Sequence, residues 1–183
     1  MIKKALSKTR SILGNKQLHQ ELSQRKTRNI KYTAVDDAKT IAIISDLSND
    51  YTFNNIINFS KKFSSEGKEV TTLFCNNDKE IPKFYNREPS LIDKSLISRI
   101  GIPEKSAIEK FINTEFDYLF DFSDNNSFTI EYIFALSSAH LKVSKSSLNT
   151  SKFADVCLAL HGKNEVQDYL NAINNYLNIS TKK

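Results

Sequence analysis

Residues 40–46 have the sequence Thr-Ile-Ala-Ile-Ile-Ser-Asp, and this stretch decides the fold. Five apolar or β-branched residues stand together without helical spacing, and a polar turn follows from Ser45 to Asp50. A short continuous apolar run of this kind is typical of a strand that is buried on both faces. We therefore expect a parallel sheet with helices on both sides, with this strand at its centre.

A helix and a second strand follow. Phe53, Ile56, Ile57 and Phe63 recur at helical spacing, and Gly67 stands where a left-handed residue would end the helix. Residues 69–75 predict the second strand. A strand, a helix of about 14 residues and another strand form a right-handed crossover, which requires parallel pairing.

The rest of the chain continues this alternation. Further strands are predicted at 117–123, 141–144 and 155–160, and helices follow the first and last of them. Residues 79–103 are irregular, and we expect their apolar side chains to pack over a sheet edge. The fold class is α/β: a three-layer Rossmann-like sandwich of about five mostly parallel strands, with a basic helical N-terminal extension.

The positive charge is concentrated at the N-terminus. The 183-residue chain has a formal net charge of +5. Residues 1–32 hold nine bases against one acid, which gives +8 and leaves 17 bases against 20 acids, or −3, for residues 33–183. We therefore divide the chain into a basic arm, 1–32, and a Rossmann-like domain, 33–183. The arm predicts a polyanionic partner, with nucleic acid ahead of membrane. The candidate contacts are Lys3, Lys4, Lys8, Arg10, Lys16, Arg25, Lys26, Arg28 and Lys31.

Other interpretations of the arm stay open. Its apolar stripe is thin for a helix that lies on a membrane, and it is interrupted near Gly14-Asn15. Attachment to an anionic membrane, a solvated tail and a mitochondrial-type targeting segment are the alternatives. The aromatic residues are not interleaved with cations, so binding should act through phosphates without base readout and depend steeply on salt. We expect RNA or a ribonucleoprotein, such as the ribosome, as partner.

Composition points to a cytoplasmic protein without a transmembrane segment. The longest apolar runs have only about five residues, too few to span a bilayer. Cys75 and Cys157 are too few for a disulfide framework and fall in predicted strands. We expect both to be buried free thiols in a reducing compartment.

Polar side chains end the first and third predicted strands. Asp46 and Ser48 follow one, and Asp121 and Ser123 end the other. Parallel sheets bind ligands at the carboxyl ends of their strands, so these four are possible ligand-binding residues. Two aspartates there could hold a divalent metal or act as an acid and a base. The alternative is that they cap the following helices.

The sequence predicts no catalytic residues, no metal and no cofactor. None of the four glycines lies in the first strand-to-helix turn, where a dinucleotide pyrophosphate requires one. The histidines do not cluster. We therefore expect a protein that is not an enzyme.

Several segments resemble a known family. They are Ile-Ile-Ser-Asp-Leu-Ser-Asn at 43–49, Glu-Ile-Pro-Lys-Phe-Tyr at 80–85, Phe-Asp-Tyr-Leu-Phe-Asp-Phe-Ser at 116–123 and Ala-Leu-Ser-Ser-Ala-His-Leu-Lys-Val-Ser at 135–144. With the basic N-terminal segment, they resemble a family of small, uncharacterised bacterial proteins with a domain of unknown function. The resemblance implies a Rossmann-like core and no particular activity.

Residues 116–144 also resemble the N-terminal half of heptosyltransferase-like glycosyltransferases. Those enzymes need a second Rossmann-like domain to bind the nucleotide-sugar, and this chain is too short to contain one. The resemblance thus supports the fold and argues against the activity. Our first hypothesis is a non-enzymatic binding protein whose arm contacts RNA phosphates. The alternative is a small-ligand-binding or degenerate glycosyltransferase-like protein with a site at the strand ends.

Overall fold

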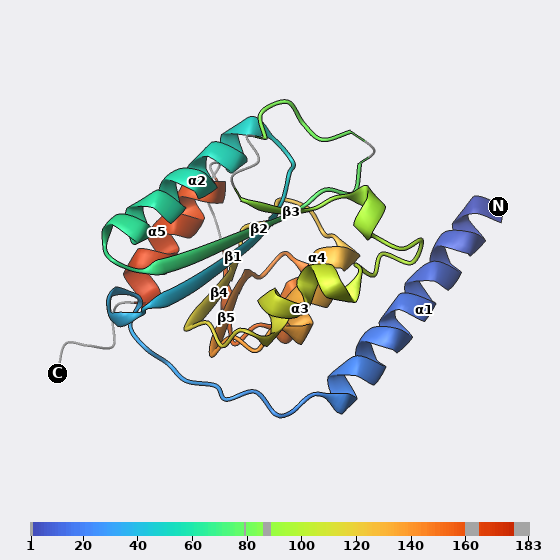
Figure 1. Cartoon of the computed structure of the whole chain (residues 1–183), viewed down its shortest axis with the longest axis horizontal. Coiled ribbons are helices and arrows are strands. Elements are labelled where there is room, and N and C mark those ends of the chain that lie inside the picture. The colour runs from blue at the N-terminus through green and yellow to red at the C-terminus, as the bar shows by residue number, and fades with distance from the viewer. Residues whose placement is uncertain (1, 79, 86–88, 160–164, 178–183) are drawn as a thin grey trace.

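The computed structural model describes residues 2–78, 80–85, 89–159 and 165–177, with only the backbone for residues 2–11, 165, 166 and 174. In this part of the chain, six parallel strands form one sheet in the order β3-β2-β1-β4-β5-β6 (Figure 1). The strands are β1 (Thr40–Asp46), β2 (Glu69–Cys75), β3 (Ser90–Ile92), β4 (Tyr118–Asp121), β5 (Leu141–Lys145) and β6 (Val156–Leu158).

The expected α/β class and Rossmann-like layering are confirmed, with six strands rather than about five. The additional strand is β3, in the irregular middle of the chain. Its three residues pair with the end of β2, where Leu73 lies opposite Ser90. A strand this short leaves no alternating pattern to recognise. Residue 160, the end of the last predicted strand, lies outside the described residues.

Helices cover both faces of the sheet. The first face carries α2 (Asp50–Ser65) and α5 (Glu165–Leu177), and the second carries α3 (Lys105–Asn113) and α4 (Phe128–Leu136) (Figure 1). Short 3-10 helices lie at Val35–Asp37, Lys94–Leu96 and Asn149–Phe153. The basic N-terminal segment forms α1 (Ile2–Gln24), which lies on the outer side of the second face.

Strand β1 is buried on both sides, which explains its continuous apolar sequence. Ile41 and Ile43 belong to the core under α2 and α5, whereas Ala42 and Ile44 belong to the core under α3 and α4. All four are fully buried. Because successive side chains of a strand point to opposite faces, each face of the sheet requires its own apolar set.

Helix α2 forms as the spacing predicts. Asn49 precedes it as N-cap, and its Oδ1 accepts a hydrogen bond of 2.8 Å from the backbone N–H of Thr52. The buried side chains include Phe53 and Ile56. Gly67 lies just beyond the helix with a φ of +83°, a conformation that favours glycine.

Helix α4 needs α1 as a cover. Every side chain from Thr129 to Leu136 is buried, and a helix that is buried all round requires packing partners on all sides. The sheet lies on one side, and α1 places the fully buried Leu18 in the same core. At Gly14 the two segments come so close that an added Cβ would lie 2.7 Å from the Cε1 atom of Phe128. Helix α1 is therefore packed on the domain.

The two cysteines differ. Cys75 is buried as expected, but Cys157 is exposed, so the expectation of a second buried thiol is wrong. Cys157 lies on β6, which is one of the two edge strands of the sheet among the described residues. Sequence alone did not distinguish this edge strand from a central one.

Candidate functional site

The chain reverses its direction of winding between β1 and β4. These strands are neighbours, β2 lies beyond β1, and β5 lies beyond β4. Doubly wound sheets bind their ligands at such a switch point. Asp46, Ser48, Asp121 and Ser123, the four residues predicted from the strand ends, all lie at this edge of the sheet.

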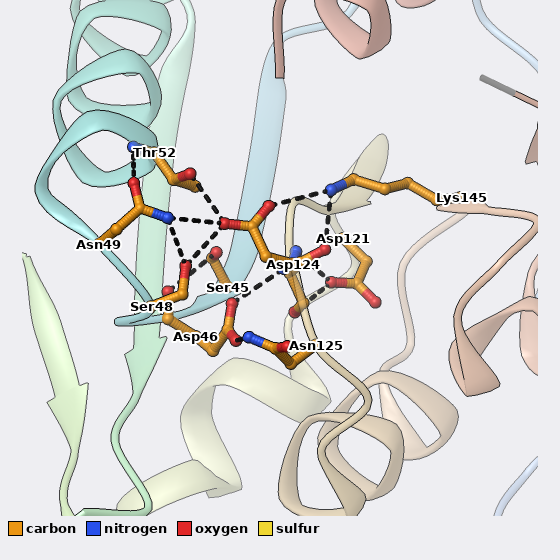
Figure 2. Close-up of polar contacts among 10 residues, drawn as sticks. Ser45, Asp46, Ser48, Asn49, Thr52, Asp121, Asp124, Asn125 and Lys145 are labelled. Atoms are coloured by element: carbon orange, nitrogen blue, oxygen red, sulfur yellow. Dashed lines mark hydrogen bonds and ion pairs between the residues drawn. The ribbon is translucent and has the colours of Figure 1, made fainter. Parts of the chain in front are cut away.

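Asp124, which the sequence analysis did not select, is the centre of the polar contacts there (Figure 2). Its Oδ2 accepts hydrogen bonds from Ser48 Oγ (2.7 Å), Thr52 Oγ1 (2.8 Å) and Asn49 Nδ2 (3.1 Å). Its Oδ1 lies 3.4 Å from Nζ of Lys145, which is almost fully buried. Desolvation raises the pKa of Asp124, but the hydroxyl donors and the lysine outweigh it and keep that pKa below its usual value.

Asp46 joins the end of β1 to the loop after β4. Its Oδ1 accepts from the backbone N–H of Asp124 and its Oδ2 from Asn125 Nδ2, both at 3.0 Å. Desolvation raises the pKa of Asp46, and these two hydrogen bonds oppose the rise. The carboxylate thus holds the two loops of the switch point together.

Asp121 is fully buried. Its Oδ1 accepts from the backbone N–H of Ser123 (2.9 Å) and from Ser123 Oγ (2.6 Å), and its Oδ2 accepts from Thr150 Oγ1 (2.6 Å). Desolvation raises the pKa of Asp121, and the three donors and Lys145 partly offset it. Asp121 therefore fixes its own loop and the 3-10 helix that carries Thr150.

The three aspartates form a closed network. Each carboxylate bonds to donors of its own chain, and no hydrogen bond joins Asp46 to Asp121 within the described residues. The space beside Asp121 has no room for a water molecule. No three His, Cys, Asp or Glu residues of the described part gather as metal ligands. The arrangement holds loops in place and offers little access to a ligand.

Sequence reasoning missed the donors that later elements bring to this edge. Lys145 reaches Asp124 and the carbonyl of Ser123 from β5, and Thr150 reaches Asp121 from the following 3-10 helix. The predicted strand at 141–144 stopped one residue short of Lys145. A lysine at the end of a strand is usually exposed to solvent, so the sequence contained no sign that Lys145 is buried.

Two arginines fasten the basic segment to the domain. Arg25 Nη2 donates to the carbonyl of Ile112 (3.0 Å), Asn113 Oδ1 (2.9 Å) and Ser138 Oγ (3.0 Å). Arg28 forms a two-pronged ion pair with Asp155, at 2.5 and 2.7 Å. Its Nη1 also donates to the carbonyls of Ala139 and His140. Both arginines are thus engaged within the molecule.

The lysines of the segment behave differently. Lys16, Lys26 and Lys31 are exposed. The side chains of Lys3, Lys4, Lys8 and Arg10 lie outside the described residues, although their backbone belongs to α1. No described helix is long and apolar enough to cross a membrane.

Comparison with known proteins places the chain in a family. The model of a family of unknown function, DUF6913, matches residues 10–179. The chain belongs to the DUF6913 family. A comparison with curated proteins finds no match. The resemblance to a family of unknown function is therefore confirmed, whereas the resemblance to glycosyltransferases stays a prediction.

The DUF6913 match begins inside α1 and includes the last 15 residues of that helix. Arg25, Arg28 and Lys26 lie within it, as does the aspartate network. The part of α1 that covers α4 is therefore part of the DUF6913 unit. The match ends at residue 179, so it includes all six strands.

Proposed function

We propose that this protein is a non-enzymatic binding protein whose basic N-terminal segment contacts RNA phosphates, as a factor associated with the ribosome or another ribonucleoprotein. One observation carries the proposal: the arginines at positions 25 and 28 hold the segment on the domain, while Lys16, Lys26 and Lys31 face solvent. The segment thus presents its lysines from a fixed base.

Physical chemistry favours phosphate contacts without base readout. A lysine ammonium is a compact, flexible point charge that neutralises a phosphate and releases its counterion. Each such contact steepens the dependence of log K on log salt by about 0.7 to 0.9. Three exposed lysines would therefore contribute about 2 to this slope, and more if the lysines of the first turns of α1 take part.

The alternative is ligand binding or a degenerate glycosyltransferase-like activity at the strand ends. The closed aspartate network gives it less support than the exposed lysines give to RNA binding, because the carboxylates already accept internal donors. We therefore place the function at the basic segment. A cytoplasmic location belongs to the same proposal.

Charge-matched variants test the proposal. One variant carries Lys16→Gln, Lys26→Gln and Lys31→Gln, and its control carries Lys39→Gln, Lys61→Gln and Lys62→Gln, also exposed. Each lowers the net charge from +5 to +2. The measurement is fluorescence anisotropy with a labelled RNA over a salt series. We expect the salt slope to fall by about 2 in the first variant and to stay near the wild-type value in the control. Equal losses in both variants would contradict the proposal.

Co-sedimentation identifies the partner. We expect the full chain to sediment with ribosomes at low salt and to be released by nuclease treatment or high salt. Deleting residues 1–32 is a poor test, because Leu18 and the two arginines contribute to the packing of the domain. The lysine variants avoid this problem. Binding to anionic vesicles as tight as binding to RNA would favour membrane attachment and contradict the proposal.

A further inference from the structure

A cavity of about 340 Å³ lies where the segment after α1 crosses the end of α4. Arg25, Lys26 and Arg28 line one wall, and Ser137, Ser138 and Lys142 belong to the other. The lining holds four cations and no carboxylate. A pocket lined by charges of one sign concentrates the electric field and attracts an anion.

Lys142 is the most unusual of these groups. Lys142 is only 3% exposed, although lysine residues are rarely buried unless they are paired with an opposite charge. Within the described residues, its Nζ has one hydrogen-bond acceptor, the carbonyl of Ala135 at 2.8 Å, and it lies 5.7 Å from the centre of the Phe134 ring. An ammonium has three N–H donors, so this site leaves donors for a ligand.

The local charges do not balance. Among the described residues, Asp155 forms its ion pair with Arg28 and accepts the backbone N–H of Lys142 at 2.8 Å. Glu21, on α1, adds a second negative charge that acts on Arg25. Arg25 makes its hydrogen bonds through Nη2 to neutral acceptors, and no described carboxylate forms an ion pair with it. Burial, Arg28 and Arg25 lower the pKa of Lys142 to about 7, while Asp155 opposes the change.

The two serines complete the set of donors. Ser137 Oγ accepts a hydrogen bond from the backbone N–H of Ala139, and Ser138 Oγ accepts one from Arg25. The O–H groups of Ser137 and Ser138 can therefore still donate a hydrogen bond to a ligand. Donors therefore lie on both walls of the cavity. A phosphate group, with three strong acceptor oxygens, can accept from more of them than a carboxylate, which has two.

We propose that this cavity binds a phosphate group through Arg25, Lys26 and Lys142, with the hydroxyls of Ser137 and Ser138 as further donors. The proposal goes beyond the RNA contacts above, because it places one phosphate in a defined cavity. That phosphate belongs either to a small free phosphate compound or to an RNA backbone. In both cases the bound anion favours the charged form of Lys142, so the amine takes up a proton when the phosphate group binds.

Calorimetry with inorganic phosphate tests the site. The full chain is titrated on the alkaline side of the second pKa of inorganic phosphate, where the ligand is already a dianion and Lys142 is mostly neutral. Two buffers of different ionisation enthalpy and matched ionic strength are used. The variant is Lys142→Met. Its control is Lys68→Met, since Lys68 is also buried, donates to the carbonyls of Asp36 and Ala38, and lies over the Phe63 ring.

We expect Lys142→Met to weaken phosphate binding by about tenfold or more and to abolish the proton uptake. The Lys68→Met protein should bind as the wild type does. Absence of binding at millimolar phosphate, or equal binding by Lys142→Met, would overturn the proposal. Should Lys142→Met fail to fold, NMR of the lysine side chains in the wild type decides: phosphate must raise the pKa of Lys142, and an unchanged pKa refutes the site.

Competition separates the two sources of phosphate. If RNA delivers the phosphate, inorganic phosphate weakens RNA binding to the wild type more than chloride of equal ionic strength does, and it has no such effect on Lys142→Met. If RNA binding is indifferent to phosphate, the ligand is a small phosphate compound. Phosphate binding without any RNA binding would refute the proposed function and leave this site standing.

Discussion

At the scale of single residues, Lys142 links folding to pH. In the unfolded chain its amine has an ordinary pKa of 10.5, whereas in the folded chain the pKa is about 7. Between these values the unfolded state holds more protons, so the free energy of unfolding rises with pH, by at most about 1.4 kcal/mol per unit. Below about pH 7 both states carry the proton, and the folded state bears the full cost of the buried charge.

Urea unfolding at a series of pH values, compared with Lys142→Met, isolates this effect. We expect the free energy of unfolding of the wild type, relative to that of the variant, to rise from pH 7 to about pH 9. The reason is that the folded wild type loses the buried charge of Lys142 over this range, whereas methionine does not titrate. Contributions from other groups cancel in the difference. A difference that does not change with pH would show that Lys142 keeps an ordinary pKa.

Asp124 is the second residue with a testable role, because it faces the buried Lys145. Asp124→Ala removes the acceptor of three side-chain donors and the ion-pair partner at 3.4 Å from the buried ammonium of Lys145. We expect the free energy of unfolding to fall by about 3 kcal/mol, against about 1 kcal/mol for Ser48→Ala, which removes one donor. Because the pKa of Asp124 lies below its usual value of 3.8, its stabilisation is present above that value and disappears in acid.

Chemical denaturation at neutral and at acid pH measures both the cost of each substitution and its dependence on pH. The difference in the free energy of unfolding between the wild type and Asp124→Ala should become smaller as the pH falls through the lowered pKa of Asp124. Equal costs for Asp124→Ala and Ser48→Ala would mean that Lys145 does not depend on this carboxylate.

At the scale of elements, Gly14 decides how closely α1 packs. A Cβ there would lie 2.7 Å from Phe128 Cε1 and 3.0 Å from the carbonyl oxygen of Ile100. Alanine favours a free helix by about 1 kcal/mol over glycine, so the substitution separates a docked helix from a free one. We expect Gly14→Ala to lower stability and to speed hydrogen exchange of the α1 amides. Ser23→Ala, an exposed position of the same helix, should do neither, and slower exchange in Gly14→Ala would indicate a free helix.

The elements also show what the sequence can predict. The strand at 40–46 follows from its continuous apolar run and helix α2 from its helical spacing, and each signal lies within about 16 residues of the chain. The docking of α1 on the domain does not follow from local sequence. Gly14 interrupts the apolar stripe of α1 and seemed to weaken it, but it is the point where α1 comes closest to Phe128. The strand-end aspartates were predictable because parallel strands end at one edge. Their partners Lys145 and Thr150 were not, because they arrive from elsewhere in the chain.

At the scale of the whole molecule, we propose that two kinds of cation perform two tasks: the arginines hold the segment on the domain, and the exposed lysines contact phosphate. The formal count gives residues 1–32 a charge of +8, but Arg28 is neutralised by Asp155, and Arg25 is bound to neutral acceptors of the domain. Guanidinium groups suit fixed, multiple hydrogen bonds, and ammonium groups suit a mobile polyanion. Sequence composition counts arginines and lysines alike. It therefore predicts the net charge of the segment but does not show which cations bind to the domain and which face solvent.

Arg28→Gln and Lys26→Gln separate these tasks, because each removes one positive charge. We expect Arg28→Gln to lower the free energy of unfolding by about 1 to 3 kcal/mol, since a two-pronged ion pair and two carbonyl contacts disappear, and to leave the RNA salt slope unchanged. Lys26→Gln should keep the stability and lower the slope by about 0.7 to 0.9. Denaturation and anisotropy over a salt series measure the two effects. If Arg28→Gln lowers the slope as much as Lys26→Gln, the arginine contacts phosphate itself, and the segment is not anchored through it when RNA binds.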